Sequence, residues 1–230
     1  MDRIATPLWP LPLGIAALLF LAAHAALALS AQAGYVPYCI PYWEGCTSIS
    51  RAARHGLGNH VFRLVMLPCA LLQGLHWWSA RRWLHLQRNG GRGGRSLIPL
   101  GAVAGLALAV YATFLGSEGE VYRFLRRYGV VVYFASSYLA QLVFLRQLHR
   151  QGIAQRGSAG IMLAICVAML LMGVTNTAAT ALLADEGLKD RLENALEWQL
   201  GWLLAAWFVM QAWLWRRSGY AMTLYSDRGR

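Results

Sequence analysis

The stretch LIPLGAVAGLALAVYATFLG, residues 97–116, decides the fold of this chain. It carries no charged side chain, and about 20 apolar residues are enough for a helix to cross the hydrocarbon core of a bilayer. Inside lipid, every backbone N–H and C=O group needs a partner within the protein. The stretch is therefore predicted to be a transmembrane helix.

Five further runs of the chain have the same character. The composition agrees, because 57% of the residues are hydrophobic and 13% are charged, against about 25% charged in a typical soluble domain. The alternation of polar and apolar residues that a membrane barrel requires is absent. We predict an all-α polytopic membrane protein, a single domain over residues 1–230 with six transmembrane helices. The five runs lie near residues 8–30, 61–79, 128–147, 159–184 and 195–215.

The charges of the loops are sorted by side. The two termini and the loops at about 80–96 and 145–158 hold 13 of the 21 Lys and Arg residues and 2 of the 10 acidic residues. The other three loops hold 8 of each kind. Positive charge collects on the cytoplasmic side of membrane proteins, so both termini are predicted to be cytoplasmic. The Arg-rich loops would meet anionic lipid headgroups, and this assignment argues against nucleic-acid binding.

The first run has a second interpretation. Met1-Asp2-Arg3, an apolar stretch and Ala31-Gln32-Ala33 together resemble a signal peptide with its cleavage site. Its apolar core is longer than the usual 7–15 residues, which favours a retained helix. The predominance of Arg over Lys is compatible with a GC-rich bacterial gene, and we expect the protein in a bacterial inner (plasma) membrane.

The longest loop, at about residues 31–60, lies on the extracytoplasmic side. Cys39 and Cys46 stand in it, and an oxidising compartment would allow them to form a disulfide. Their spacing is not C-x-x-C, which argues against a redox pair. A zinc site with His55 and His60 would lack a known ligand spacing. No metal and no cofactor are predicted.

Polar residues collect toward the outer ends of the predicted helices, where they indicate a functional cavity. Arg63 opens the second run and Glu197 opens the sixth. Few polar residues are expected in the inner halves, apart from His76 and Gln141. We predict that Arg63 binds a phosphate and that Glu197 orients it or acts as a base. The other candidates are His60 and Glu118 as catalytic residues, with Ser48, Ser50, Asn176 and Ser137 as substrate-binding residues.

Three interpretations of these residues remain open, namely two kinds of catalysis and a purely structural role. Ser48 or Ser50 with His60 and Glu197 has the residue types of a hydrolase triad, without a G-x-S-x-G signature. A single His with a carboxylate could instead serve an acyltransferase as a base. Alternatively, an Arg–Glu pair and hydrogen bonds between helices would merely hold the bundle together.

Several short motifs resemble those of the Frag/DRAM/Sfk family of six-pass membrane proteins. They are Cys39-Ile40-Pro41, the run from Thr47 to Ala53, Val61-Phe62-Arg63, Ser117-Glu118, the run from Phe134 to Ser137, and Glu197-Trp198. The chain departs from the family pattern at Thr47, where a Pro is expected. It also lacks a clear match for the His that the family carries near Tyr122 and Arg123.

The resemblance implies lipid handling at the extracytoplasmic leaflet, since the family includes a post-GPI-attachment factor that takes part in lipid remodelling. It assigns this role to Ser48, Ser50, Arg63, Glu118 and Glu197. We therefore expect a protein that binds or remodels a membrane lipid or lipid-linked substrate, as a lipid acyltransferase or hydrolase-like enzyme. The alternatives are a non-enzymatic lipid regulator or scramblase-like protein, and a structural membrane subunit.

Overall fold

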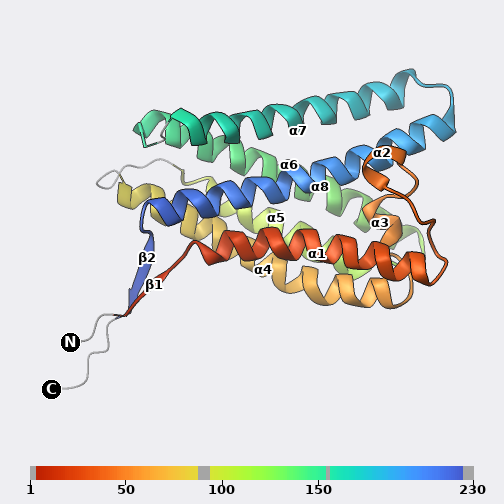
Figure 1. The fold of residues 1–230 in the computed structure, drawn as a ribbon, viewed down its shortest axis with the longest axis horizontal. Coiled ribbons are helices and arrows are strands. Elements are labelled where there is room, and N and C mark those ends of the chain that lie inside the picture. Colours follow the sequence, from red (N-terminus) through yellow and green to blue (C-terminus); the bar gives the residue numbers. More distant parts are fainter. Residues whose placement is uncertain (1–3, 88–93, 154–155, 225–230) are drawn as a thin grey trace.

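Each apolar run forms one long helix in the computed structural model, which describes residues 4–87, 94–153 and 156–224. The helices lie side by side along the long axis of the molecule (Figure 1). Their bounds are α1 (Pro10–Gln32), α4 (Gly56–Gln87), α5 (Leu97–Phe114), α6 (Glu120–Gln151), α7 (Arg156–Leu182) and α8 (Glu186–Arg217). The predicted helical architecture is therefore confirmed.

Several helices extend beyond the apolar runs that predicted them. The polar segment from Glu118 to Arg127, expected as a loop, is mostly the first turns of α6. At the start of α8, the Asp185 side chain caps the helix by accepting hydrogen bonds from the N–H groups of Gly187 and Leu188, at 2.8 and 3.0 Å. Once a helix is nucleated, adding polar residues costs little. The loop predicted at about 80–96 begins within α4, which continues to Gln87, and its residues 88–93 lie outside the described residues.

Within the described part of the chain, four helices are long and apolar enough to cross a membrane, namely α1, α5, α6 and α7. The helices α4 and α8 have the length but contain more polar and charged residues. A solvent-exposed surface as apolar as that of α7 fits lipid as its surroundings. The fold is that of a membrane protein.

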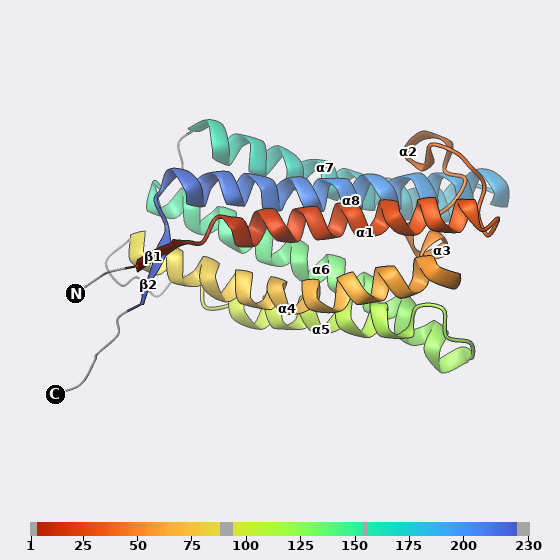
Figure 2. The ribbon, with the colours of Figure 1, turned by 60° about the horizontal axis from the view of Figure 1, so that its bottom comes forward.

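The helices pack as a ring in the order α7, α8, α1, α4, α5 and α6. Figure 2 shows α1 between α8 and α4, with α5 beyond α4. Large aromatic side chains fill the interior, and five tryptophans are fully buried. The ring closes loosely between α6 and α7, where an open apolar groove of about 710 Å³ separates the two helices.

A short antiparallel sheet, which the all-α prediction missed, joins the two ends of the described chain. Its strands are β1 (Ile4–Pro7) and β2 (Ala221–Leu224), with Ile4 opposite Leu224 in the register. The strands lie at the end of the bundle where α1 begins and α8 ends (Figure 1). The pairing therefore places both chain ends at the same end of the bundle.

Candidate functional site

The long first loop lies over the opposite end of the bundle and contains two short helices, α2 (Pro41–Glu44) and α3 (Ile49–Ala52). Three side chains of α8 donate hydrogen bonds to backbone carbonyl groups of this loop. The pairs are Trp198 Nε1 to Thr47 at 2.9 Å, Asn194 Nδ2 to Gly45 at 2.8 Å and Gln199 Nε2 to Tyr42 at 2.9 Å. The loop is thus a cap fixed to α8, and we refer to residues 33–55 as the cap.

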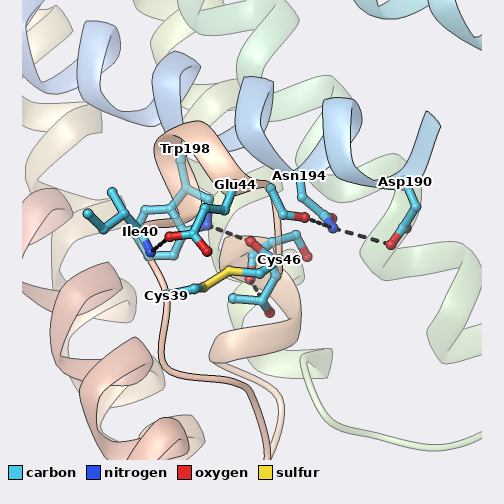
Figure 3. Close-up of a disulfide and its surroundings, with 10 residues drawn as sticks. Cys39, Ile40, Glu44, Cys46, Asp190, Asn194 and Trp198 are labelled. Carbon is cyan, nitrogen blue, oxygen red and sulfur yellow. Dashed lines mark hydrogen bonds between the residues drawn. A yellow bond between two sulfur atoms is a disulfide. The ribbon is translucent and has the colours of Figure 1, made fainter. Parts of the chain in front are cut away.

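A disulfide between Cys39 and Cys46, the pair for which the sequence predicted one, closes the part of the cap that contains α2. Figure 3 shows the bond beside Trp198 and Asn194 of α8. The Glu44 carboxylate accepts a hydrogen bond from the backbone N–H of Ile40 at 2.8 Å. Crosslink and hydrogen bond together restrict the segment whose carbonyl groups α8 binds.

An ion pair fastens the cap at its other side. The Arg51 guanidinium donates two hydrogen bonds to the Asp190 carboxylate, at 2.7 and 2.5 Å. The hydrogen bond from Arg51 holds the pKa of the Asp190 carboxyl below its ordinary value and raises the pKa of Arg51. Both side chains are half exposed, so water screens this pair and its contribution to stability is small.

Beneath the cap lies a narrow cavity of about 60 Å³, which we call the Glu197 cavity. A buried water needs roughly 10–15 Å³ by this measure, so the cavity has room for a few waters or a small chemical group. Its walls are mainly aliphatic and aromatic. Its polar lining residues are Glu197, His24, Tyr42, Tyr111 and Tyr133.

Glu197 is the acidic member of that lining, and the structure also gives it a packing role. Its Oε1 atom accepts a hydrogen bond from the backbone N–H of Ser50 at 3.0 Å. This N–H belongs to the first turn of α3, where backbone donors lack partners within the helix. The carboxylate of Glu197 therefore joins α8 to the cap and faces the cavity.

His24 and Tyr42 form a hydrogen-bonded pair at the wall of the same cavity. His24 Nδ1 lies 2.7 Å from the carbonyl oxygen of Phe20, which can only accept, so Nδ1 carries the proton. The Tyr42 hydroxyl then donates to Nε2 at 3.1 Å. Burial raises the pKa of Tyr42, which keeps its phenol protonated as a donor. The two hydrogen bonds thus fix the orientation of the His24 ring at the cavity wall.

The structure brings Ser48 and Ser50 close to Glu197, as the sequence predicted, but gives Ser48 a structural role. Its Oγ caps α3 by accepting a hydrogen bond from the N–H of Arg51 at 3.1 Å. The hydroxyl groups of Ser48 and Ser50 are 3.0 Å apart. Ser48 is buried, so the main role of its hydroxyl is to stabilise the start of α3.

The structure does not bring Arg63 or His60 into the Glu197 cavity. His60 is exposed on α4, and Arg63 is half-buried one turn later. Neither makes a hydrogen bond or ion pair with any residue that the structure describes. The predicted meeting of Arg63 with Glu197, and the predicted triad through His60, are therefore not assembled in this arrangement.

The other predicted site residues lie on separate elements. Glu118 is exposed in the turn between α5 and α6. Asn176 is half-buried on α7, where its carbonyl group accepts a hydrogen bond from the Thr180 hydroxyl at 2.9 Å. Ser137 is completely buried in α6. None of these three residues lines the Glu197 cavity.

Sequence reasoning did not include His24 and the three tyrosines among the site residues. One signal was available, because His24 is the polar residue within the apolar stretch of α1 and such residues usually face the bundle interior. The tyrosines gave no comparable signal, since Tyr is common at membrane interfaces. Their convergence depends on packing between helices that are distant in sequence.

Among the described residues, no group of three His, Cys, Asp or Glu side chains is placed to hold a metal ion. The site instead offers one carboxylate, one imidazole and phenol hydroxyls in apolar surroundings. Such a set can accept a proton from a bound group, orient it by hydrogen bonds and exclude bulk water. Comparisons with protein-family models, curated proteins and solved structures found no match to this chain.

Proposed function

We propose that this chain is a six-span integral membrane protein that binds and remodels a lipid or lipid-linked molecule at the extracytoplasmic leaflet. In this proposal, α1 and α4 to α8 span the membrane, the cap lies outside, and both termini are cytoplasmic in a bacterial inner membrane. The sorting of charges between the two sides supports that orientation. Membership of the Frag/DRAM/Sfk family is part of the proposal and is supported by the motifs in the cap and in α8.

The observation that carries the proposal is the position of Glu197. Its carboxylate lines a mostly apolar cavity beneath a cap that disulfide and hydrogen bonds hold in place. Placing a carboxylate in such surroundings is costly, and in membrane proteins it commonly marks a substrate site or a proton-transfer site. A base at this depth would act on a group presented by a lipid.

A second pocket gives a lipid a route to that carboxylate. It is an open pocket of about 550 Å³ among α1, α2, α7 and α8, and its lining is mainly apolar. Phe20, His24, Tyr42 and Trp202 line both this pocket and the Glu197 cavity. Because the cavity is too small for a whole lipid, we infer that the lipid lies in the open pocket. Only its reacting ester or phosphoryl group would then enter between His24 and Glu197.

Each polar residue then has a chemical task in the proposed reaction. Glu197 would accept a proton from the attacking hydroxyl or water. The Tyr42 hydroxyl oxygen would accept a hydrogen bond from the substrate, and the proton that Glu197 takes up would pass to the leaving oxygen as the ester or phosphoryl bond breaks. Arg63 would bind phosphate only after moving from its half-buried position on α4.

The test begins with lipid extracted from the purified protein and identified by mass spectrometry. Conversion of that lipid is then measured for the unchanged protein, for Glu197→Gln and for Glu186→Gln, an exposed acid of the same helix. The proposal expects loss of conversion in Glu197→Gln alone, with an unchanged melting temperature. Equal conversion by Glu197→Gln and the unchanged protein would refute it.

One observation favours a second candidate, a structural membrane subunit. The hydrogen bond from Ser50 to Glu197 gives the carboxylate a structural role that requires no substrate. On this alternative, no specific lipid would co-purify, and Glu197→Ala, which removes the acceptor, would lower stability and change nothing else.

A further inference from the structure

The interior of the bundle contains a second set of polar side chains, only part of which the sequence indicated. We expected few polar residues in the inner halves of the helices apart from His76 and Gln141, yet α4, α6 and α8 together place several uncharged polar groups in the interior at 0% exposure. Several of their polar atoms have no hydrogen-bond partner among the described residues. These atoms are both ring nitrogens of His76, both amide atoms of Gln211, Ser137 Oγ, Gln141 Nε2, Trp207 Nε1 and Trp215 Nε1.

Helix geometry brings His76 of α4 opposite Gln211 of α8. The His76 ring contacts Phe208 and Trp215, with ring centroids 5.0 and 5.1 Å apart. Phe208 and Trp215 are two helical turns apart, and Gln211 lies between them on the same face of α8. We infer that the unpartnered atoms of His76 and Gln211 lie near one another in the interior of the ring, between α4 and α8.

Unpartnered polar atoms at this depth are not expected in a stable fold. A buried donor or acceptor without a partner costs about 1–3 kcal/mol, and lipid offers no replacement. Buried polar groups in native proteins almost always have a partner, either protein or ordered water. The number of buried polar atoms without a partner on α4, α6 and α8 points to a bound ligand.

The chemistry of the set identifies the ligand. It contains donors and acceptors, because the tryptophans and Gln141 offer N–H groups, while Gln211 and His76 offer both kinds. It contains no carboxylate, and no three metal-binding side chains meet among the described residues. A metal ion or a charged solute would find no counter-charge there. We propose that α4, α6 and α8 enclose ordered water molecules that bridge His76 and Gln211 and satisfy their neighbours.

A polar route connects this site with the Glu197 cavity. Tyr133 lines the cavity and donates a hydrogen bond from its hydroxyl to Oε1 of Gln73 at 3.2 Å. Gln73 is completely buried and lies one turn before His76 on α4. The hydrogen-bonded pair of Tyr133 and Gln73 therefore lies between the Glu197 cavity and the turn of α4 that carries His76.

Hydroxyl-radical footprinting of the purified protein tests this proposal, because radicals formed from bound water label buried side chains beside it. We expect Trp207 and Trp215 to be oxidised several times faster than Trp83. Trp83 is a matched control, since it is equally buried but donates its N–H to Ser218 Oγ at 3.0 Å. Labelling of Trp215 no faster than that of Trp83 would overturn the proposal.

A double-mutant cycle provides an independent test. Water shared by two residues couples them, so His76→Phe and Gln211→Met together should lower the melting temperature by less than the sum of their separate effects. His76→Phe with Asp190→Asn is the control cycle, because Asp190 lies at the far end of α8, about 30 Å from Gln211. Additive shifts for His76 and Gln211 in folded variants would equally overturn the proposal.

Discussion

The backbone N–H of Ser50 donates a hydrogen bond to the carboxylate of Glu197 at 3.0 Å, although the two residues are 147 positions apart in the chain. This bond is where the cap, the last helix and the polar cavity meet. It gives one side chain two tasks, because the same carboxylate completes the first turn of α3 and faces the cavity. Variants of Glu197 must therefore separate stability from function.

Glu197→Ala is expected to destabilise the protein more than Glu197→Gln. Alanine leaves the Ser50 N–H without its acceptor, at a cost of about 1–3 kcal/mol. The amide oxygen of Gln can still accept that bond. Melting temperatures in detergent would check this order, and equal effects of both variants would show that the bond contributes nothing.

Gly45→Ala is expected to unfold the cap. Gly45 ends α2 with a φ of 58°, and an added Cβ would lie 1.8 Å from the carbonyl oxygen of Arg191. Gly152 has a similar φ of 63° with nothing within 4 Å of an added Cβ, so Gly152→Ala carries only the left-handed strain of about 1–2 kcal/mol. The unfolding free energies should therefore differ by several kcal/mol, and similar values would contradict the close approach of α2 to α8.

The ion pair between Arg51 and Asp190 predicts a weak dependence of stability on acid. Because the folded pKa of Asp190 is below its unfolded value of 3.8, the pair stabilises the fold fully above that value. Its contribution is lost as the pH falls through the folded pKa. Melting temperatures between about pH 6 and pH 3 should fall slightly less for Asp190→Asn than for the unchanged protein. A larger fall in the variant would contradict this assignment.

Reduction of the Cys39–Cys46 disulfide is expected to loosen the cap while leaving the helices intact. Closing so short a loop stabilises the folded state by about 2–3 kcal/mol in the chain-entropy model. Cysteine counting on denatured, unreduced protein should find only the two buried thiols, Cys69 and Cys166. Limited proteolysis after reduction should cut within residues 33–55. The Cys39→Ser/Cys46→Ser variant should show the same cleavage pattern without reductant. Four reactive thiols before reduction would disprove the bond.

Sequence pattern predicted the long helices well because apolar runs of this length have one stable form in lipid. It predicted their ends poorly, as in α6 and α8, because polar turns continue a helix without leaving a hydropathy signal. The pairing of β1 with β2 was also missed, since four-residue strands at the two ends of a chain carry too little pattern to identify.

The candidate site was predictable only in part. Glu197 stood out as an acid at the start of an apolar run, and the cap residues Ser48 and Ser50 were placed beside it. Arg63 stood out equally, yet its rotation about the axis of α4 keeps it out of the cavity lining. Which face of a helix meets which neighbour depends on side-chain packing, and neither α4 nor α8 has a strongly one-sided sequence. For the same reason, the proposed link between His76 and Gln211 was not predictable.

The proposed orientation leads to a labelling experiment on single cysteines introduced at opposite ends of the bundle. Glu186→Cys lies at the exposed start of α8, at the cap end, and Ser96→Cys lies at the exposed start of α5. From the charge distribution we expect the first position outside the membrane and the second inside. A membrane-impermeant maleimide added to intact cells should therefore label Glu186→Cys, and should label Ser96→Cys only after the cells are lysed. The native thiols Cys69 and Cys166 are buried, so labelling of the unchanged protein measures the background signal. Labelling of Ser96→Cys in intact cells, with Glu186→Cys protected, would invert the topology and move the Glu197 cavity to the cytoplasmic leaflet.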